Sequence, residues 1–193
     1  MPVNLIRPTR LALAAAALAA FVPLAAQAQA TLSASPAANP VAVGAPLVVT
    51  VSVANIVDLY AHQFTLSFNP AVLQVGSVSE GAFLGAGGST LFDAGTINNT
   101  AGTVSFVLGT LVGGVGGVNG SGVLATLNFT VTGLGTSPLA LSDVLALDSM
   151  LMDIPVQLTN GTVTAVPEPG SWLMLAAGVA GLGAWMRRRT VSA

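Results

Sequence analysis

Three aspartates recur every five residues late in the chain, at Asp143, Asp148 and Asp153. Ca²⁺ binds several oxygen ligands at once, so carboxylates spaced this closely are candidate ligands for a calcium ion, the one cofactor that the sequence suggests. The spacing is not that of an EF-hand loop. The alternative is that the three aspartates occupy solvated turns, in which case added Ca²⁺ would leave the thermal stability unchanged.

The span between residues 31 and 166 offers few groups for catalysis. His62 is its only histidine, and it contains no cysteine or lysine. A Ser-His-Asp triad would need His62 as its base, but this histidine alternates in phase with apolar residues, which predicts a satisfied histidine in a sheet or at its edge. A glycosidase needs two carboxylates that flank a sugar, and nothing in the sequence pairs the acidic residues. We therefore predict that the protein is not an enzyme.

All five arginines lie at the two ends of the chain, at Arg7, Arg10 and Arg187 to Arg189, so the span between them carries only acidic charge. A polyanion such as DNA would be repelled, because phosphate contacts need Lys or Arg, and nucleic acid is excluded as a partner. Without cysteine the protein has no disulfides and no thiolate metal site. Its stability must come from a hydrophobic core, which a span of about 136 residues can bury.

Residues 1–30 have the pattern of a secretory signal peptide. Arg7 and Arg10 make the beginning positive, residues 11–24 are apolar and rich in alanine, and small residues alternate from Ala26 to Ala30. We expect cleavage after Ala28 or Ala30. An uncleaved N-terminal membrane helix is the alternative, although the apolar run is short for one.

Residues 166–193 predict a membrane-anchored tail. The prolines of Pro167-Glu168-Pro169 cannot lie inside a helix, and the uncharged stretch from Ser171 to Met186 would form a transmembrane helix about 24 Å long. Trp172 and Trp185 lie near its ends, where indole rings favour the membrane interfaces. The cluster of Arg187, Arg188 and Arg189 would stay cytoplasmic, which places residues 31–165 on the outer side of the membrane.

This tail resembles the PEP-CTERM sorting signal of Gram-negative bacteria. The resemblance rests on Val166-Pro167-Glu168-Pro169, on the apolar stretch from Trp172 to Met186 with its glycine-rich centre, and on the terminal arginines. It implies processing near the Pro-Glu-Pro motif by an exosortase-type enzyme and delivery of the protein to the cell surface or the extracellular matrix. An unprocessed C-terminal anchor is the alternative, and a mature protein that keeps the three arginines would exclude processing.

The span between the two ends predicts an all-β domain. Apolar and polar residues alternate through residues 47–54, 60–68, 104–108 and 127–132, which is typical of strands with one buried face. Asn160-Gly161 predicts a two-residue hairpin turn. Short strands with frequent turns favour a β-sandwich or jelly roll between the signal helix and the transmembrane helix. A flat aromatic platform for sugars is not expected, because both tryptophans are in the tail and the strand phenylalanines share the buried phase: Phe64, Phe68, Phe106 and Phe129.

The same span, residues 31–165, resembles a cohesin domain. Its first half carries the resemblance in Val49–Val53, in Gln63–Leu73 with its aromatic-Asn-Pro-x-x-Leu stretch, and in Val78–Gly81; Gly122–Phe129 and the stretch closing at Val163 resemble later strands. The resemblance implies a nine-stranded jelly roll, related to some carbohydrate-binding modules, that docks a partner domain such as a dockerin without catalysis. The lack of any basic residue departs from the family's pattern.

Together these features predict an exported, non-catalytic module that docks or adheres at the cell surface or in the extracellular matrix. The alternative is a carbohydrate-binding module associated with exopolysaccharide or with polysaccharide breakdown. An exposed apolar patch on one sheet would favour docking, a polar groove would favour a glycan, and a cleft with facing carboxylates would indicate an enzyme. Because the edge strands lack charged gatekeepers, we also expect some self-association.

Overall fold

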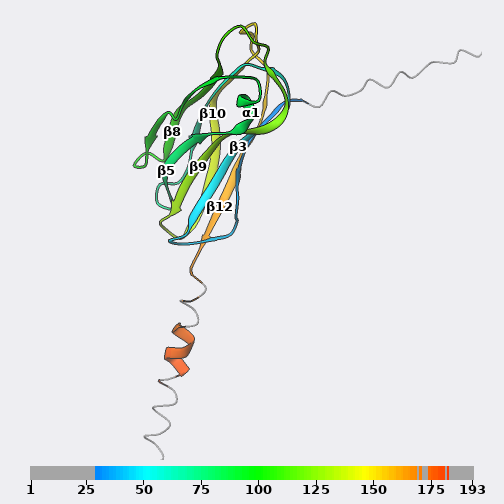
Figure 1. The fold of residues 1–193 in the computed structure, drawn as a ribbon. Coiled ribbons are helices and arrows are strands. Elements are labelled where there is room, and N and C mark those ends of the chain that lie inside the picture. Colours follow the sequence, from blue (N-terminus) through cyan, green and yellow to red (C-terminus); the bar gives the residue numbers. More distant parts are fainter. Residues whose placement is uncertain (1–28, 169, 171–173, 181, 183–193) are drawn as a thin grey trace, which may run out of the picture.

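The computed structural model describes residues 29–168, 170, 174–180 and 182. Its main part is a sandwich of two β-sheets (Figure 1). The first sheet has five strands in the order β11 (Gln157–Thr159), β1 (Thr31–Pro36), β3 (Pro46–Leu59), β9 (Val118–Val131) and β5 (Leu73–Glu80). The short helix α1 (Ala82–Gly85) follows β5 and packs on β9, where the ring of Phe83 occupies the space beside Gly122.

The second sheet has seven strands. Their order is β2 (Val41–Ala42), β12 (Gly161–Val166), β10 (Gly135–Leu147), β4 (Ala61–Ser67), β8 (Thr103–Leu111) and β6 (Thr90–Asp93), while β7 (Thr96–Asn98) also pairs with β8. The predicted β-sandwich is therefore confirmed, and the described part of the chain holds no helix that is long and apolar enough to cross a membrane. Residues 174–180 of the tail are helical.

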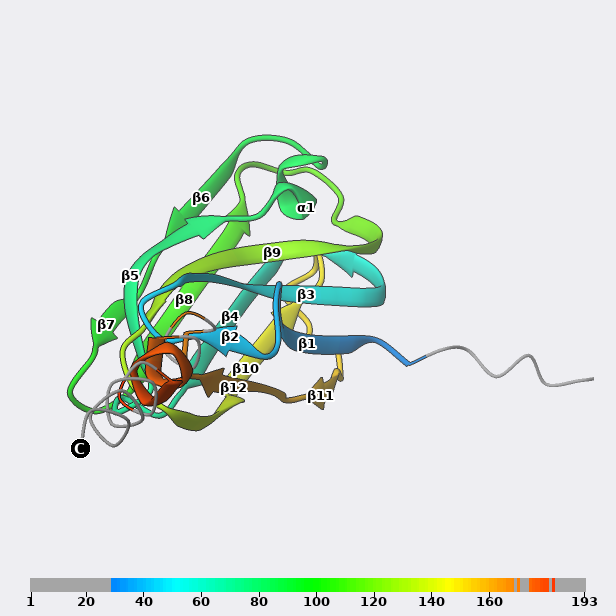
Figure 2. The same ribbon diagram turned by 90° about the horizontal axis from the view of Figure 1, so that it is seen from below.

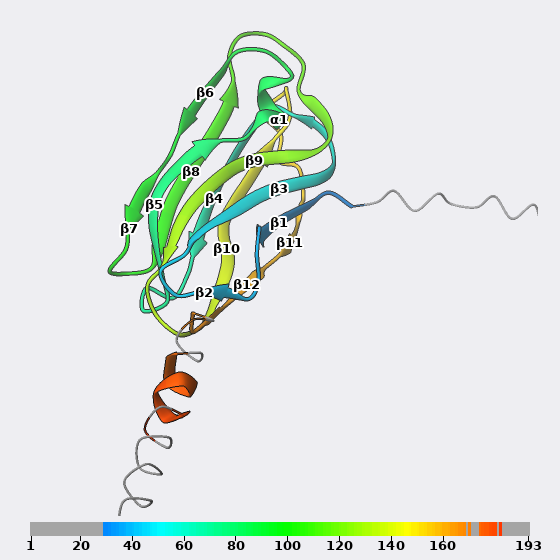
Figure 3. The ribbon, with the colours of Figure 1, turned by 60° about the horizontal axis from the view of Figure 1, so that its bottom comes forward.

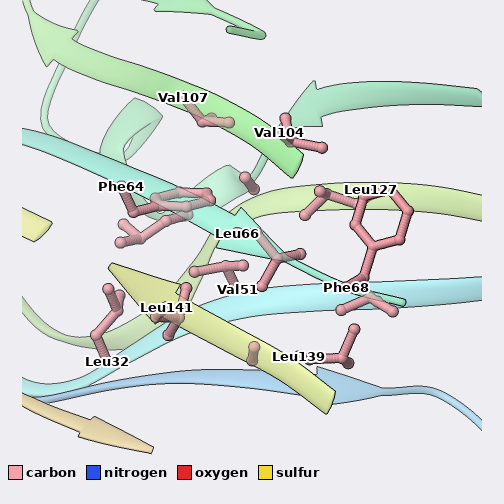
Figure 4. Packing of buried hydrophobic residues seen from close by; sticks show 14 of the residues in the cluster. Leu32, Val51, Phe64, Leu66, Phe68, Val104, Val107, Leu127, Leu139 and Leu141 are labelled. Atoms are coloured by element: carbon pink, nitrogen blue, oxygen red, sulfur yellow. The ribbon is translucent and has the colours of Figure 1, made fainter. Parts of the chain in front are cut away.

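The core lies between the sheets and follows the predicted alternation. On β3, Leu47, Val49, Val51 and Val53 are each no more than 2% exposed. Phe64 and Leu66 face them from β4, and Leu127 packs beside them from β9 (Figure 4). The rings of Phe68 and Phe129 meet edge to face with centroids 5.2 Å apart. Each fully buried side chain of this kind contributes roughly 1.5–3 kcal/mol, so such a core can hold the sandwich together without disulfides.

The predicted hairpin at Asn160-Gly161 is wrong. β11 and β12 do not pair with each other: β11 runs parallel to β1 in the five-stranded sheet, whereas β12 pairs with β10 and β2 in the other sheet. The chain thus crosses between the sheets at these two residues (Figure 2). The side chain of Asn160 accepts a hydrogen bond from the backbone N–H of Leu141 at 3.0 Å, and Gly161 lies against the carbonyl of Ala34, where only a residue without a Cβ fits.

β8 also departs from the predicted alternation. Val104 and Val107 are both fully buried, while Phe106 between them is 60% exposed. The cause is a bulge in the β4–β8 ladder, where the register shifts between Phe64 and Leu66 and Phe106 adopts a φ of +57°. A bulge adds one residue to one strand and turns a side chain to the other face. The prediction that Phe106 belongs to the core is therefore wrong.

At the outer edge of β5, the backbone of Val75 is paired with a side chain, and the edge does not depend on a charged residue for protection. The amide of Asn99 bonds the backbone of Val75 in both directions: Val75 N–H donates to Oδ1 at 2.8 Å, and Nδ2 donates to the Val75 carbonyl at 3.0 Å. Asn99 follows β7 in the second sheet, so this pair also ties the two sheets together at their open side. A paired edge is a poor template for strand addition from another molecule.

We expect the substitution Asn99→Ala to lower the free energy of unfolding by about 1–3 kcal/mol, because it leaves two backbone groups of a buried residue without partners. It should also expose the β5 edge and promote association, which light scattering at increasing concentration would detect. Urea unfolding gives the stability. The neighbouring change Thr100→Ala removes no such pair and serves as the control; equal effects of the two substitutions would contradict this account of the edge.

Candidate docking face

The outer face of the seven-stranded sheet gathers the exposed apolar side chains of four strands. The residues that alternate with the core point outward and form two rows across β10, β4, β8 and β6, in that order. The first row is Leu145, Gln63, Leu108 and Asp93, and the second is Leu147, Ala61, Thr110 and Leu91. Leu91 is 62% and Leu145 41% exposed. A shallow hollow of about 40 Å³ lies among Ala61, Gln63, Leu108, Leu145 and Leu147. We call this surface the docking face.

Two bulges shape the docking face on either side of β4. In β8 the bulge raises Phe106, whose backbone N–H donates to Thr65 Oγ1 at 3.3 Å. In β10 the register shifts between Ser142 and Leu145, and Asp143 adopts a φ of +49°. A positive φ is unfavourable for a bulky residue such as phenylalanine and persists only where the surrounding structure enforces it, which is common at functional sites. The exposed ring of Phe106 is thus presented by a strained backbone.

The docking face carries negative charge at two sides. Asp93 lies on β6, where one of its oxygens accepts the backbone N–H of Gly95 at 2.9 Å, and Asp143 lies on the β10 bulge. The described residues between 29 and 168 include no Lys or Arg. The surface is therefore an apolar centre between two carboxylates, with no cleft in which carboxylates face each other across a substrate.

The three candidate calcium ligands are not brought together. Asp143 lies on the β10 bulge, while Asp148 Oδ1 accepts the backbone N–H groups of Met150 and Met152, both at 2.8 Å, and Asp153 pairs with Leu147 in an isolated bridge. In the part of the chain that the structure describes, no three acidic or histidine side chains form a group that could hold a metal ion. The three aspartates are evenly spaced in the sequence, but the β10 bulge and the loop that follows β10 separate them in space.

His62 lies in the core, and it also lines the hollow of the docking face. It is 4% exposed, and its ring stacks on that of Phe64 with centroids 6.1 Å apart. The buried phase predicted for it is confirmed, but the prediction of a satisfied histidine is wrong, because neither ring nitrogen has a hydrogen-bond partner. Burial lowers the pKa of His62 from 6.5 to about 4, since the charged ring would have no compensation there. Without a bonded hydroxyl or carboxylate it forms no catalytic triad.

A further carboxylate, that of Asp58, binds three loops together at one end of the sandwich. Its Oδ1 accepts the N–H of Gly117 at 2.7 Å, its Oδ2 accepts the hydroxyl of Ser149 at 2.7 Å, and its own N–H donates to Asn119 Oδ1 at 2.8 Å. The hydrogen bond from Ser149, followed by that from Gly117, lowers the pKa of Asp58 below its usual 3.8. No pattern in the sequence pointed to Asp58 as a functional residue; its only local sign is that Asp tolerates the φ of +60° found here.

Several predicted site residues lie outside the described part of the chain. These are Ala28 of the signal cleavage pattern and Pro169, Trp172, Trp185, Arg187, Arg188 and Arg189 of the tail. Pro167 and Glu168 are described and follow β12 directly. Ala30 is only 9% exposed, and its carbonyl accepts the N–H of Gln157 at 2.8 Å, which extends the pairing between β1 and β11.

The sandwich is similar to several solved structures. A non-cellulosomal cohesin from the archaeon Archaeoglobus fulgidus is 22% identical, with a TM-score of 0.59 over 76% of this chain and 98% of that one. The sixth cohesin of scaffoldin B from Acetivibrio cellulolyticus, solved with a mutant Cel5 dockerin, is 20% identical, with a TM-score of 0.57 over 72% and 100%. A type I cohesin–dockerin complex from Clostridium thermocellum matches at 15% identity and a TM-score of 0.58, over 72% and 100%. No curated protein gives a match.

Two family models match the sequence in succession. The model of the PEP-CTERM protein-sorting motif covers residues 165–189 and confirms the resemblance of the tail. The model of the cohesin domain covers residues 32–165, which is most of the chain and all but the first and last residues of the sandwich. The chain therefore belongs to the cohesin family and carries a PEP-CTERM motif behind its cohesin domain.

Proposed function

We propose that the protein is a non-catalytic receptor that docks another protein on the docking face. The observation that carries this proposal is the exposed ring of Phe106, which lies on the same face of the sheet as the exposed side chains of Leu91 and Leu145. Large apolar side chains in one exposed area mark interaction surfaces in soluble proteins, and aromatic anchors at the centre dominate the affinity of such interfaces. The relatives from Acetivibrio cellulolyticus and Clostridium thermocellum were solved with dockerins. A dockerin-like domain is accordingly the first partner to test.

The two ends of the chain carry the signals that would direct this receptor to the cell surface or matrix. We infer export through the N-terminal signal peptide, temporary anchoring by a helix within residues 171–186, and processing near Pro167-Glu168-Pro169 by an exosortase-type enzyme. The PEP-CTERM motif supports this route to the cell surface or matrix. Of the two cleavage positions expected for the signal peptide, the one after Ala28 is favoured, because Ala30 contributes a hydrogen bond to the folded domain.

A glycan is the second candidate for the docking face. The exposed ring of Phe106 is the observation that favours it, because the alternation along β8 predicted this ring to be buried and so unable to stack on a sugar. One phenylalanine with Gln63 and Asp93 nearby could contact a single sugar unit of an exopolysaccharide, whereas the leucines around them have no role in such binding. The apolar surroundings therefore favour a protein partner.

The test is capture by the immobilised domain from the organism's envelope and secreted fractions, with and without a Ca²⁺ chelator. A dockerin needs Ca²⁺ to fold, because its binding loops use carboxylates as ligands, so a dockerin-like partner should be lost on chelation. The substitution Phe106→Ser should weaken capture about 30-fold or more, as expected for loss of an aromatic hot spot. The control Leu134→Ser removes a side chain of similar exposure, 61%, outside the docking face.

Each outcome decides between the candidates. Capture that depends on Phe106 and on Ca²⁺ supports the receptor. Capture of polysaccharide alone, again dependent on Phe106, moves the function to glycan binding. Capture that Phe106→Ser and Leu134→Ser affect equally would overturn the assignment of the docking face.

A further inference from the structure

The docking face has carboxylates on both of its flanks. On one flank, Asp93 ends the first row on β6, and on the other flank Asp143 lies on the β10 bulge. Asp153 lies beyond β10, where it pairs with Leu147 across an isolated antiparallel bridge and so continues the second row. All three aspartates are exposed. Because β6 and β10 lie on the two sides of β8 and β4 (Figure 3), the apolar centre of the face lies between the two flanks.

The strand ladders fix the distance between the two flanks. Three steps between neighbouring strands separate the β6 strand of Asp93 from β10, which amounts to about 14 Å. The bridge at Asp153 lies one step further, at about 19 Å from β6. Between the flanks stand Leu108, Leu145 and the exposed ring of Phe106. The carboxylates are therefore too far apart to hold one small ion between the flanks, and they border an area wide enough for the apolar side chains of a partner.

No positive charge offsets these carboxylates in the described residues between 29 and 168, which include no Lys or Arg. Asp93 accepts the N–H of Gly95, and Asp143 Oδ2 accepts the hydroxyl of Ser142 at 3.4 Å, but a hydrogen bond from a neutral group leaves the negative charge in place. Such a surface repels DNA, anionic lipid and a second copy of itself, and it attracts a cationic partner.

The apolar surface of the docking face continues into the loop that follows β10. This loop adjoins the face at Leu147 and Ala61, and the side chains of Met150–Met152 are 63–81% exposed. The carboxylate of Asp148, which accepts the N–H groups of both methionines, adds a further negative charge beside them. An apolar area bordered only by negative charge is complementary to a partner whose own apolar side chains are bordered by Lys or Arg.

We propose that the partner of the docking face is a basic protein surface, in which an apolar centre is flanked on both sides by Lys or Arg residues about 14 to 19 Å apart. The apolar centre packs on Phe106 and Leu145, while one basic side chain meets Asp93 and others meet Asp143 and Asp153. This inference rests on the proposed function, because it names the chemistry of the partner that docks there. The apolar contacts supply most of the affinity, whereas the charge pairs at the rim raise the association rate and exclude other partners.

The test selects partners from a defined library instead of a cell extract. A phage library of a small helical domain, with random residues over one of its faces, is selected on the immobilised cohesin domain at low salt. Clones that fail to bind Phe106→Ser are kept. The solved cohesins consist of this domain alone, since the matches cover 98–100% of their chains, so residues 29–168 are used as a folding unit. The chain has no cysteine, and one cysteine added after residue 168 attaches the domain with its docking face free.

The kept clones should contain an excess of Lys and Arg over the starting library, on two sides of an apolar group. Their association with the wild type should slow about tenfold between low and high NaCl, because salt screens charges at the rim of an interface. The combined change of Asp93, Asp143 and Asp153 to asparagine should slow association at low salt by a similar factor of about ten and remove most of the salt dependence.

The asparagine changes are chosen to preserve the fold. Asparagine keeps the side-chain oxygen that accepts the N–H of Gly95, and it tolerates the positive φ at position 143. The matched control for Asp93→Asn is Glu80→Gln, which removes the same unit of charge outside the docking face, where the Glu80 carboxylate accepts the hydroxyl of Thr90. Asp93→Asn alone should slow association about threefold, and Glu80→Gln should leave the rate nearly unchanged.

The remaining outcomes distinguish failure of this inference from failure of the proposed function. Clones that depend on Phe106 but show no basic excess, or whose binding ignores both NaCl and the asparagine changes, would overturn the inference and keep the docking face. The absence of any clone that depends on Phe106 would overturn both. Binding of chitosan, a cationic polysaccharide, that the three asparagine changes abolish and Phe106→Ser retains, while the clones show no basic excess, would assign the flanks to a glycan and overturn the basic protein partner.

Discussion

Replacing His62 by leucine should remove most of the stability that the protein loses to acid between pH 6.5 and pH 4. In the unfolded chain this histidine takes up a proton near pH 6.5, but in the folded protein only near pH 4, because burial disfavours the charge. Above pH 6.5 the histidine is protonated in neither state, so its titration does not change the free energy of unfolding. As the pH falls through this window only the unfolded state binds the proton, so the wild type loses roughly 3 kcal/mol of stability, the full loss being reached below pH 4.

The experiment is urea unfolding at half-unit steps from pH 7.5 to pH 4. His62→Leu should also be more stable than the wild type at pH 7 by about 1 kcal/mol, because two buried nitrogens without partners are removed. His62→Gln is the matched control: it cannot titrate, so its profile should have the same shape as that of His62→Leu, but it keeps polar atoms in the core and gains nothing at pH 7. The Asp58 carboxyl, whose pKa is lowered in the folded protein, adds a loss that begins only toward the acid end of this range and is shared by all three proteins. A wild-type profile as flat as that of His62→Leu would contradict the pKa shift.

Gly161→Ala should be among the most damaging single substitutions in the domain. Gly161 begins β12 at the point where the chain crosses between the sheets, and an added Cβ would lie 2.3 Å from the carbonyl oxygen of Ala34 on β1. The backbone of Ala34 cannot move away from this Cβ without moving β1 from the core. We therefore expect the free energy of unfolding to fall by about 3 kcal/mol or more, at the upper end of the range for overpacking. Thermal unfolding followed by circular dichroism measures it.

Gly114→Ala is the control for this prediction. Its Cβ would meet nothing within 4 Å, and it lies in the glycine-rich loop between β8 and β9. The substitution should be neutral or slightly stabilising, because alanine has fewer conformations to lose on folding. Similar losses for the two alanine variants would show that the crossover is not packed as the structure has it.

The strands were predictable because their buried face repeats every second residue. Leu47 to Val53 on β3 and Leu127 to Val131 on β9 follow this rule without interruption, and the register shift between Val51 and Ser52 adds its extra residue on β9, before Leu127. The rule failed where the register changes. The bulge that turns Phe106 outward is set by pairing with β4, which lies some forty residues away in the sequence, as the Thr65 bond to its N–H shows. The residues around Phe106 contain no local pattern that predicts this bulge.

The same reasoning explains the other misses. Asn160-Gly161 has the composition of a hairpin turn, but a turn dipeptide does not determine whether the strands on its two sides pair with each other or join different sheets. Asp143, Asp148 and Asp153 were predicted to form one group because they are close together in the sequence, but they are not brought together in space. The docking face could be predicted only as a kind of surface, an exposed apolar area on one sheet, since which leucines point outward depends on the two bulges.

The crossing of the chain between the sheets has a mechanical consequence. β12 is held along its length by β10, from Gly161 opposite Leu139 to Ala165 opposite Gly135, and β2 flanks its end. A pull on the chain after β12, resisted at the far end of β10, acts along these strands and loads their hydrogen bonds together, since the bonds lie perpendicular to the strands. The domain would resist such a force in shear and would not lose these hydrogen bonds one after another.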